Sequence, residues 1–278
     1  MLNKSKIDVV VPSYNRLDYL LQSIKSIKKQ SYTANQIIVV DDDSEFSEKD
    51  FWSGLKRENI CTDRILFYKK EKNLGACHSR NLGVQLSKSE YVAFLDDDDL
   101  WEINHLEGLI NCFQNDDIVL AYSGKLIKNF TTGKERKSLN VIPDEQQFLS
   151  LLKCNYPGST SSIMVRKKSF FAAGGFDETL PAIQDYDFYL RIVKEGRITT
   201  SNIFTLIYRV DTPVKITNQL YKARKAYYLI IEKLVPQHRK VLAKTISIQN
   251  IKKAVINKKM NYIILFSFDY IKNALRKG

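Results

Sequence analysis

Four consecutive aspartates, Asp96, Asp97, Asp98 and Asp99, are the residues of this chain best suited to do chemistry. They follow the apolar stretch 91–95, which has the length of a buried strand, so their carboxylates should emerge together at its C-terminal end. Open α/β sheets bind their ligands at that edge. A hard divalent cation carrying a phosphorylated ligand would offset the repulsion between the four acids. The alternative is a solvated turn whose last aspartate caps a helix over 101–113.

Polar turns also follow other expected elements. The strand 7–11 leads into Pro-Ser-Tyr-Asn-Arg at 12–16, and the strand 37–40 leads into Asp-Asp-Asp-Ser at 41–44. Groups of this kind can bind the base and the ribose of a nucleotide. A third turn, Asn-Leu-Gly-Ala at 73–76, opens a helix carrying Arg80, and a helix N-terminus favours anionic groups. Each turn is a weak signal alone, whereas their ordered recurrence is a strong one.

The elements that must position these turns alternate along the first 210 residues. Leucines and isoleucines recur with helical spacing over 17–27, and a second helical pattern occupies 82–86. This alternation predicts an α/β fold in which helices cover both faces of a mainly parallel sheet. The expected strands are 7–11, 37–40, 65–68, 91–95, 118–122 and 162–165.

Charge separates the chain into two parts, with a composition break at 211–213. Residues 1–214 hold 28 Lys or Arg against 29 Asp or Glu, whereas residues 215–278 hold 15 against two. We therefore expect one domain over 1–214 and a basic extension over 215–278, made of two or three helices divided at Pro236. The segment 260–275 combines Tyr, Ile and Phe with flanking lysines, which suits the surface of an anionic membrane. A helical cap on the core is the alternative, and no nucleic-acid partner is expected because the tail carries no readout module.

Other classes of protein fit the sequence poorly. The N-terminus is polar and lacks a signal pattern, so we expect a cytoplasmic protein. No apolar run approaches the length that spans a bilayer. The four cysteines are widely spaced and form no metal or redox motif. The turn after the first strand is not Gly-x-Gly-x-x-Gly, which argues against a nicotinamide cofactor.

Five segments, in this order, resemble glycosyltransferase family 2, whose members have the GT-A fold and use nucleotide-diphosphate sugars. The segments are VVVPSYNR at 9–16, IIVVDDDS at 37–44, NLGACHSRNLGV at 73–84, YVAFLDDDDLW at 91–101 and GGFDETLPAIQDYDFYLRI at 174–192. The resemblance spans residues 5–210. It implies a Rossmann-like, mixed and mainly parallel sheet, but it leaves the sugar and the acceptor open.

The resemblance also implies a role for each turn in binding a nucleotide-sugar donor, which we expect to be a UDP-sugar. Pro12 would contact the base through its backbone and Tyr14 would stack on it, with Asn15 in the same turn. Asp42 would accept a hydrogen bond from the base, and Arg80 would lie near the base or the diphosphate.

Within the acid run, the family's metal-binding motif falls on the first three residues. Asp98 would be the direct ligand of Mg²⁺ or Mn²⁺, while Asp96 and Asp97 would serve the ribose and the water shell of the metal. Asp99 is then not needed by the motif, and it would cap a helix or pair with a nearby basic group.

A second motif of the family, Glu-Asp-x-Asp, is matched at 184–187, where Gln184 stands in place of the usual Glu. Asp185 falls on the position of the catalytic base. One base and no protein nucleophile imply inversion at the anomeric carbon. The alternative is that Asp185 only caps the helix that follows.

The chain departs from the family after Tyr208. In many relatives a Tyr-Arg pair is followed by a histidine that reaches the metal or the diphosphate, whereas here Arg209 is followed by Val210 and Asp211. We expect Arg209 or Lys215 to neutralise the diphosphate instead.

These inferences predict an inverting, metal-dependent glycosyltransferase. It would move a sugar to a hydroxyl of a glycan acceptor, lipid-linked, in cell-surface polysaccharide biosynthesis, as a peripheral protein at the inner face of the cell membrane. The alternative is a sugar-nucleotide-binding regulatory or scaffold protein without turnover. The presence of both Asp98 and Asp185 favours the enzyme, because a binder needs no base.

Overall fold

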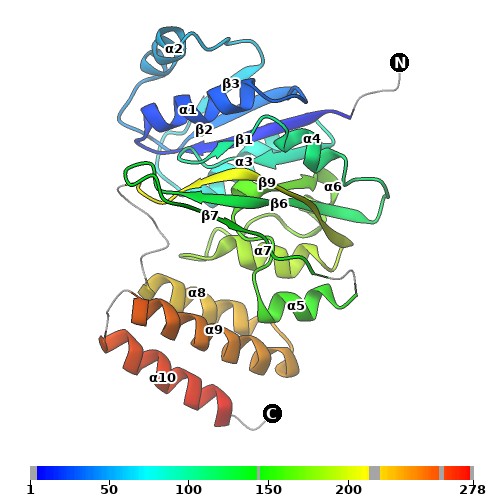
Figure 1. Cartoon of the computed structure of the whole chain (residues 1–278), viewed down its shortest axis with the longest axis vertical. Helices are drawn as coiled ribbons and strands as arrows, with labels where there is room; N and C mark the ends of the chain where they lie inside the picture. The colour runs from blue at the N-terminus through cyan, green and yellow to red at the C-terminus, as the bar shows by residue number, and fades with distance from the viewer. Residues whose placement is uncertain (1–4, 143–144, 213–219, 257–259, 276–278) are drawn as a thin grey trace.

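The computed structural model describes residues 5–142, 145–212, 220–256 and 260–275, and its upper part in Figure 1 is an α/β unit. Nine strands of the described chain form one sheet in the order β3-β2-β1-β4-β8-β6-β9-β5, with β7 paired to β6. The strands are β1 (Ile7–Ser13), β2 (Gln36–Asp41), β3 (Ile65–Lys69), β4 (Tyr91–Phe94), β5 (Leu100–Trp101), β6 (Ile118–Lys128), β7 (Glu135–Ser138), β8 (Ile163–Arg166) and β9 (Arg197–Arg209). All six expected strands are present. Five agree with their expected bounds to within two residues, whereas β6 continues beyond its expected end at 122 to Lys128.

Helices cover both faces of this sheet, as predicted (Figure 1). Successive residues of β1 point to opposite faces, so Val9 and Val11 enter one hydrophobic core and Val10 enters the other. One core contains α1 (Leu17–Lys28), α2 (Glu48–Arg57) and α4 (His105–Ile110). The other contains α3 (Ala76–Leu86), α5 (Gln147–Lys153), α6 (Lys167–Ala172) and α7 (Gln184–Ile192).

The direction of the strands brings the polar turns to one edge. Strand β1 runs parallel to β2 and β4, and β2 runs parallel to β3. Strand β8 is antiparallel to both β4 and β6, so β6 again runs in the direction of β4. The carboxyl ends of β1, β2, β4 and β6 therefore lie at the same edge of a mixed, mainly parallel sheet.

The expected helix over 101–113 is wrong in its extent. The two residues after Asp99 form β5, because Trp101 pairs with Leu206 of β9. Helix α4 begins only at His105, with Asn104 as its N-cap residue. Asp99 therefore does not cap a helix.

The tail forms three helices, α8 (Leu220–Glu232), α9 (Pro236–Ile256) and α10 (Met260–Leu275), in the lower part of Figure 1. Pro236 opens α9, as its sequence position suggested. Buried residues of α8 and α9 belong to the same core as those of α5 and α7. The expected domain boundary at 214 lies outside the described residues. No described helix is long and apolar enough to cross a membrane.

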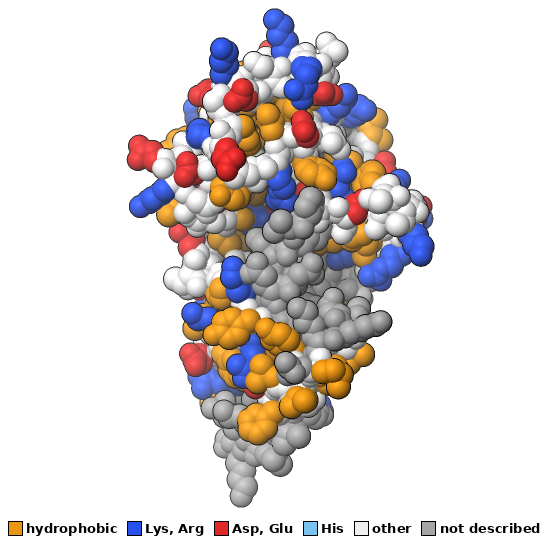
Figure 2. All heavy atoms as spheres, turned by 90° about the vertical axis from the view of Figure 1, so that its left-hand side faces the viewer, with side chains coloured by type: hydrophobic (Ala, Val, Ile, Leu, Met, Phe, Trp, Pro, Cys, Tyr) orange, Lys and Arg blue, Asp and Glu red, His pale blue; other side chains and the backbone are white. Residues whose placement is uncertain are grey.

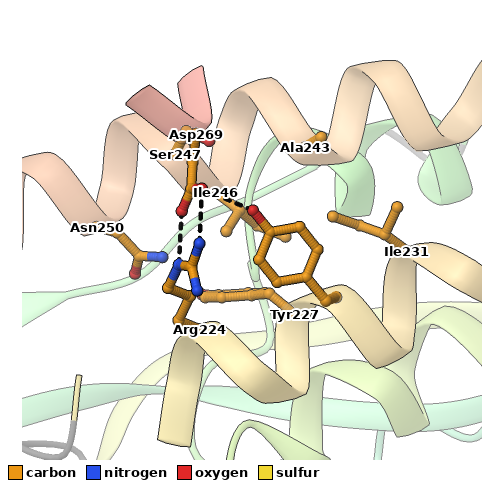
Figure 3. Close-up of a pocket in the computed structure, with 9 residues that line it drawn as sticks. Arg224, Tyr227, Ile231, Ala243, Ile246, Ser247, Asn250 and Asp269 are labelled. Carbon is orange, nitrogen blue, oxygen red and sulfur yellow. Dashed lines mark hydrogen bonds and ion pairs between the residues drawn. The ribbon is translucent and has the colours of Figure 1, made fainter. Parts of the chain in front are cut away.

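The three tail helices meet at a partly buried ion pair, shown in Figure 3. Arg224 of α8 donates to both carboxylate oxygens of Asp269 of α10, at 2.7 and 2.8 Å, and Tyr228 donates to the same carboxylate at 2.7 Å. Residues of α9, including Asn250, complete a small pocket around this pair. The pocket shares no residue with the acid run, so it is separate from the site described next.

Candidate active site

The turn that carries the four aspartates is held by two buried serines from different parts of the chain. The hydroxyl of Ser23, on α1, lies 2.8 Å from the backbone oxygens of Asp97 and Asp99. The backbone N–H of Asp96 donates to the hydroxyl of Ser161 at 3.1 Å. Both serines are fully buried. These contacts hold the backbone of the turn in place, and the four side chains then bind different partners.

Asp97 and Asp98 share one counter-ion, Arg16. The Arg16 guanidinium lies 2.5 Å from Asp97 and 2.9 Å from Asp98. Asp97 also accepts the backbone N–H of Tyr14 at 3.3 Å, which joins the first turn to the acid run. Burial raises the pKa of Asp97 to about 7, although Arg16 acts in the opposite direction.

Asp96 and Asp99 bind different partners. Arg80, on α3, donates to Asp96 at 2.5 Å and also lies 5.7 Å from the centre of the Phe176 ring. Asp99 accepts the backbone N–H of Arg209 at 3.1 Å, and burial raises its pKa well above the ordinary range. Asp99 therefore joins the turn to β9, which corrects the expectation of a helix cap.

A divalent cation fits the donor chemistry of this turn. The Asp98 side chain keeps 12% exposure, and Arg16 contacts one of its two oxygens. Carboxylate oxygens are the ligands that Mg²⁺ and Mn²⁺ prefer. No group of three or more acidic, His or Cys ligands is found among the described residues. A cation at Asp98 would thus take most of its ligands from a bound diphosphate and from water.

The first and second turns are fastened to each other through Asn15. Its backbone N–H donates to the hydroxyl of Ser44 at 2.8 Å, and its side-chain oxygen accepts the N–H of Glu45 at 2.7 Å. Asn15 has a φ of 52°, a left-handed conformation that asparagine tolerates well. Pro12 is buried within β1, whereas Tyr14 is 46% exposed. The Tyr14 ring is thus accessible to a base, as its expected stacking role requires.

Asp42 is engaged by the protein itself. Its carboxylate accepts the backbone N–H groups of Leu74 and Gly75 at 2.9 and 2.8 Å and pairs with the Lys70 ammonium. These donors fasten the turn that precedes α3 and leave Asp42 4% exposed. The expected contact between Asp42 and a base stays a prediction. The neighbouring Asp43 is exposed to solvent at the same turn.

Asp185 is brought near the acid run by α7. It accepts the N–H of Tyr186 at 2.8 Å, and the amide of Asn155 lies 3.5 Å from its other oxygen. Burial raises the pKa of Asp185, while the positive charge of Arg80 lowers it. The N-cap residue of α7 is Ile183, so Asp185 lies inside the first turn of the helix. Arg80 thus connects Asp185 electrostatically to Asp96.

Arg209, at the end of β9, and the residues that follow it were expected to contact the diphosphate. The Arg209 guanidinium donates to the backbone oxygen of Asp98 at 3.2 Å and to Gln22 at 2.8 Å, and it lies 4.1 Å from the centre of the Phe130 ring. Asp211 accepts two hydrogen bonds from Thr131, each 2.8 Å long. Lys215 lies outside the described residues. The roles proposed for Arg209 and Lys215 stay predictions.

Comparison with known proteins identifies the family. The model of the family described as "Glycosyl transferase family 2" matches residues 8–174. The chain belongs to this family. It is 28% identical to an uncharacterized glycosyltransferase of Haemophilus influenzae over 198 residues, which make up 71% of this chain and 65% of that one. It spans 32% of an uncharacterized glycosyltransferase of Rickettsia felis, to which it is 29% identical.

Two relatives from Escherichia coli have more specific names. The chain is 30% identical to "Putative colanic acid biosynthesis glycosyl transferase WcaA" of strain K12, over 70% of this chain and 68% of that one. It is 28% identical to the UDP-Glc:alpha-D-GlcNAc-diphosphoundecaprenol beta-1,3-glucosyltransferase WfaP, over 73% of this chain and 77% of that one.

Solved structures share the fold. Staphylococcus aureus TarS 1–349, in a crystal structure with UDP-GlcNAc, covers 96% of this chain at a TM-score of 0.70 and 18% identity, and 81% of TarS 1–349 is matched. GalNAc-T7, solved with UDP, GalNAc and Mn²⁺, covers 89% of this chain at a TM-score of 0.64 and 14% identity, and 51% of that chain is matched. The expected GT-A fold is thereby confirmed.

Some residues of this family 2 site could not be identified from the sequence. Arg16 follows the Tyr-Asn pair directly, so its place in the motif was a usable signal. The segment 155–162 was expected to take part in the choice of donor and acceptor, but the contact of Asn155 with Asp185 was not. Ser23 and Lys125 carry no such signal, because each reaches the site only through the packing of its own element. Lys125 is considered further below.

Proposed function

We propose that this protein transfers a sugar from a UDP-sugar to a hydroxyl of a glycan acceptor, with inversion and with the help of Mn²⁺ or Mg²⁺. The observation that carries the proposal is the placing of Asp185 beside Arg80, which itself binds the first residue of the acid run. A candidate base and a candidate metal ligand thus share one edge of the sheet. A sugar-nucleotide-binding regulator needs no such base.

The residues can perform the reaction in one displacement. The Asp185 carboxylate takes the proton of the acceptor hydroxyl as the bond from its oxygen to the anomeric carbon forms and the bond to the diphosphate breaks. Burial makes Asp185 a stronger base than an ordinary aspartate, and Asn155 orients it. A single displacement inverts the anomeric carbon. A divalent cation at Asp98 would stabilise the negative charge of the departing diphosphate.

The relatives support the finer parts of the proposal. TarS and GalNAc-T7 were solved with UDP or a UDP-sugar, and GalNAc-T7 also with Mn²⁺. WfaP is named for a UDP-glucose donor and a diphosphoundecaprenol-linked acceptor, and WcaA for colanic acid biosynthesis. For this chain we therefore propose a UDP-sugar, a lipid-linked glycan acceptor and a role in cell-surface polysaccharide biosynthesis.

A lipid-linked acceptor would require work at a membrane surface, and α10 supports this part of the proposal. Met260, Ile264 and Phe268 are each more than 60% exposed and are spaced four residues apart, so they share one face of the helix. Figure 2 shows apolar side chains, with Lys and Arg among them, on the helical part of the molecule. We propose peripheral association with the inner face of the cell membrane.

Nucleotide release from a panel of UDP-sugars and lipid-diphosphate-linked saccharides tests the activity, in the presence of Mn²⁺ or Mg²⁺. We expect Asp185→Asn to lower turnover by about 10²- to 10⁴-fold while UDP still binds. Asp98→Ala should abolish the effect of Mn²⁺ on UDP affinity. The exposed Asp63, changed to Asn, is the control. Full transfer by Asp185→Asn would exclude the assigned base, and wild type that binds no sugar nucleotide would exclude the proposed activity.

A further inference from the structure

Lys125 extends from β6 toward the edge that holds the acid run. Its ammonium nitrogen lies 5.5 Å from the centre of the Tyr208 ring. On the other side is Gly158, where an added Cβ would lie 3.4 Å from the same nitrogen. Gly158 has a φ of 78° and no side chain, so the loop before β8 leaves room for the ammonium. Lys125 is half-buried in this position.

The charges around Lys125 belong to the candidate site. Burial lowers the pKa of Lys125, and the carboxylates of Asp185 and Asp99 raise it in part. Arg136, on β7, contributes a weaker effect of the opposite sign. Contacts connect Lys125 to the same two carboxylates. Gly158, beside the ammonium, donates its N–H to Asn155, whose amide lies 3.5 Å from Asp185. Tyr208 directly precedes Arg209, whose N–H binds Asp99.

Lys125 differs from three other cations of the site in having no carboxylate at hydrogen-bond distance, and its one close neighbour of opposite polarity named above is the Tyr208 ring. Arg16, Lys70 and Arg80 each contact a carboxylate at hydrogen-bond distance. Across the described parts of the chain, by contrast, the ammonium of Lys125 makes no hydrogen bond or ion pair. Partial burial of an unpaired charge costs free energy, which an anionic ligand would recover. Among the residues that the structure describes, Lys125 is thus a cation that is available to bind an anion from a substrate.

We propose that Lys125 is a further substrate-binding residue, whose ammonium binds the diphosphate of the sugar nucleotide. The inference rests on the proposed function. The diphosphate has to lie within reach of the acid run while the anomeric carbon faces Asp185. The two neighbours of the Lys125 ammonium, Gly158 and Tyr208, connect to both ends of that space. Negative charge grows on the diphosphate as the glycosidic bond breaks, and the ammonium would neutralise part of it. The sugar and the acceptor do not enter this contact.

Calorimetric titration with UDP and UMP, in saturating Mn²⁺, isolates the contribution of the second phosphate. We expect Lys125→Gln to weaken UDP binding by about tenfold or more, and to change UMP binding much less. Lys125→Arg keeps the charge and should recover most of the UDP affinity. Lys137→Gln removes an exposed lysine of the neighbouring strand β7 and should leave both affinities unchanged.

If Lys125→Gln bound UDP as tightly as the wild type does, the inference would be overturned. The proposed UDP donor would still stand in that case, because the wild type binds UDP. Equal losses of UDP and UMP affinity would also overturn it, since Lys125 would then support the fold or the base site. Wild type that binds neither nucleotide would overturn both this inference and the proposed UDP donor.

Discussion

The protonation of Asp185 decides whether it can accept a proton. Burial raises its pKa above the ordinary 3.8, and the Asn155 amide acts in the opposite direction. Because only the carboxylate form is active, kcat/KM should fall as the pH drops through this raised pKa, at a higher pH than for an exposed aspartate. Asn155→Ala removes a donor to the charged form and should move this acidic limb to still higher pH. A pH–rate profile of both proteins is the measurement, and a limb that stays in place or moves to lower pH would contradict the role of Asn155.

Single residues of the site could be named from the sequence, but their partners could not. The acid run and Asp185 were identifiable because each stands beside a strong apolar or family pattern. That Asp97 and Asp98 share Arg16 could not be read from the sequence, because the contact depends on how the turns after β1 and β4 meet. The same holds for Asp42, whose carboxylate is bound by the turn before α3.

At the scale of elements, α1 supports the acid turn through Ser23. Ser23→Ala removes a buried hydroxyl that contacts two backbone oxygens, so we expect the free energy of unfolding to fall by about 1–3 kcal/mol. The turn should also bind Mn²⁺ and UDP more weakly. Ser53→Ala, an exposed serine of α2, should change stability by no more than about 0.5 kcal/mol. Denaturant unfolding and UDP titration measure both effects, and equal stability of the two variants would refute the supporting role of Ser23.

The strands that the sequence revealed are the ones whose residues are apolar on both faces. β1, β2 and β4 are buried along almost their whole length, and such runs stand out. Strand β9 was not expected, because the polar residues 199–202 interrupt its apolar residues. The other two unexpected strands lack an apolar pattern: β7 reads Glu-Arg-Lys-Ser, and β5 has only two residues. They are strands only because β6 and β9 offer them an edge to pair with. Local composition could not supply that information.

At the scale of the whole molecule, Lys233 fastens the tail helices to the α/β unit. Its ammonium lies 2.6 Å from Asp177 and 2.8 Å from Asp187. Burial opposes ionisation of Asp177, but hydrogen bonds from Lys233 and Thr179 lower its pKa to about 2. A carboxylate with a lowered folded pKa stabilises the protein above its unfolded pKa, and this contribution is lost as the pH falls through the folded value.

Lys233→Gln should therefore lower the free energy of unfolding at neutral pH by about 1 kcal/mol, because Lys233 is partly exposed. The difference in the free energy of unfolding between variant and wild type should become smaller as the pH falls from about 4 to about 2. Lys244→Gln, at an exposed position of α9, is the matched control. The measurement is denaturant unfolding of both proteins across this pH range. A difference in the free energy of unfolding that stayed constant would contradict the stabilising pair of Lys233 and Asp177.

Membrane association must be tested without removing the tail. Because α8 and α9 share their core with α5 and α7, cutting the chain at 214 would expose that core and confuse loss of binding with loss of folding. Ile264 and Phe268 are 67% and 64% exposed on α10, so changing both to Ser should spare the fold. We expect this pair of changes to weaken sedimentation with phosphatidylglycerol vesicles by about tenfold or more. Ile103→Ser, at a 61% exposed position before α4, should bind as the wild type does. Undiminished binding by the double variant would exclude α10 as the membrane-contacting element, and the lysines alone would then have to account for any attraction to the vesicles.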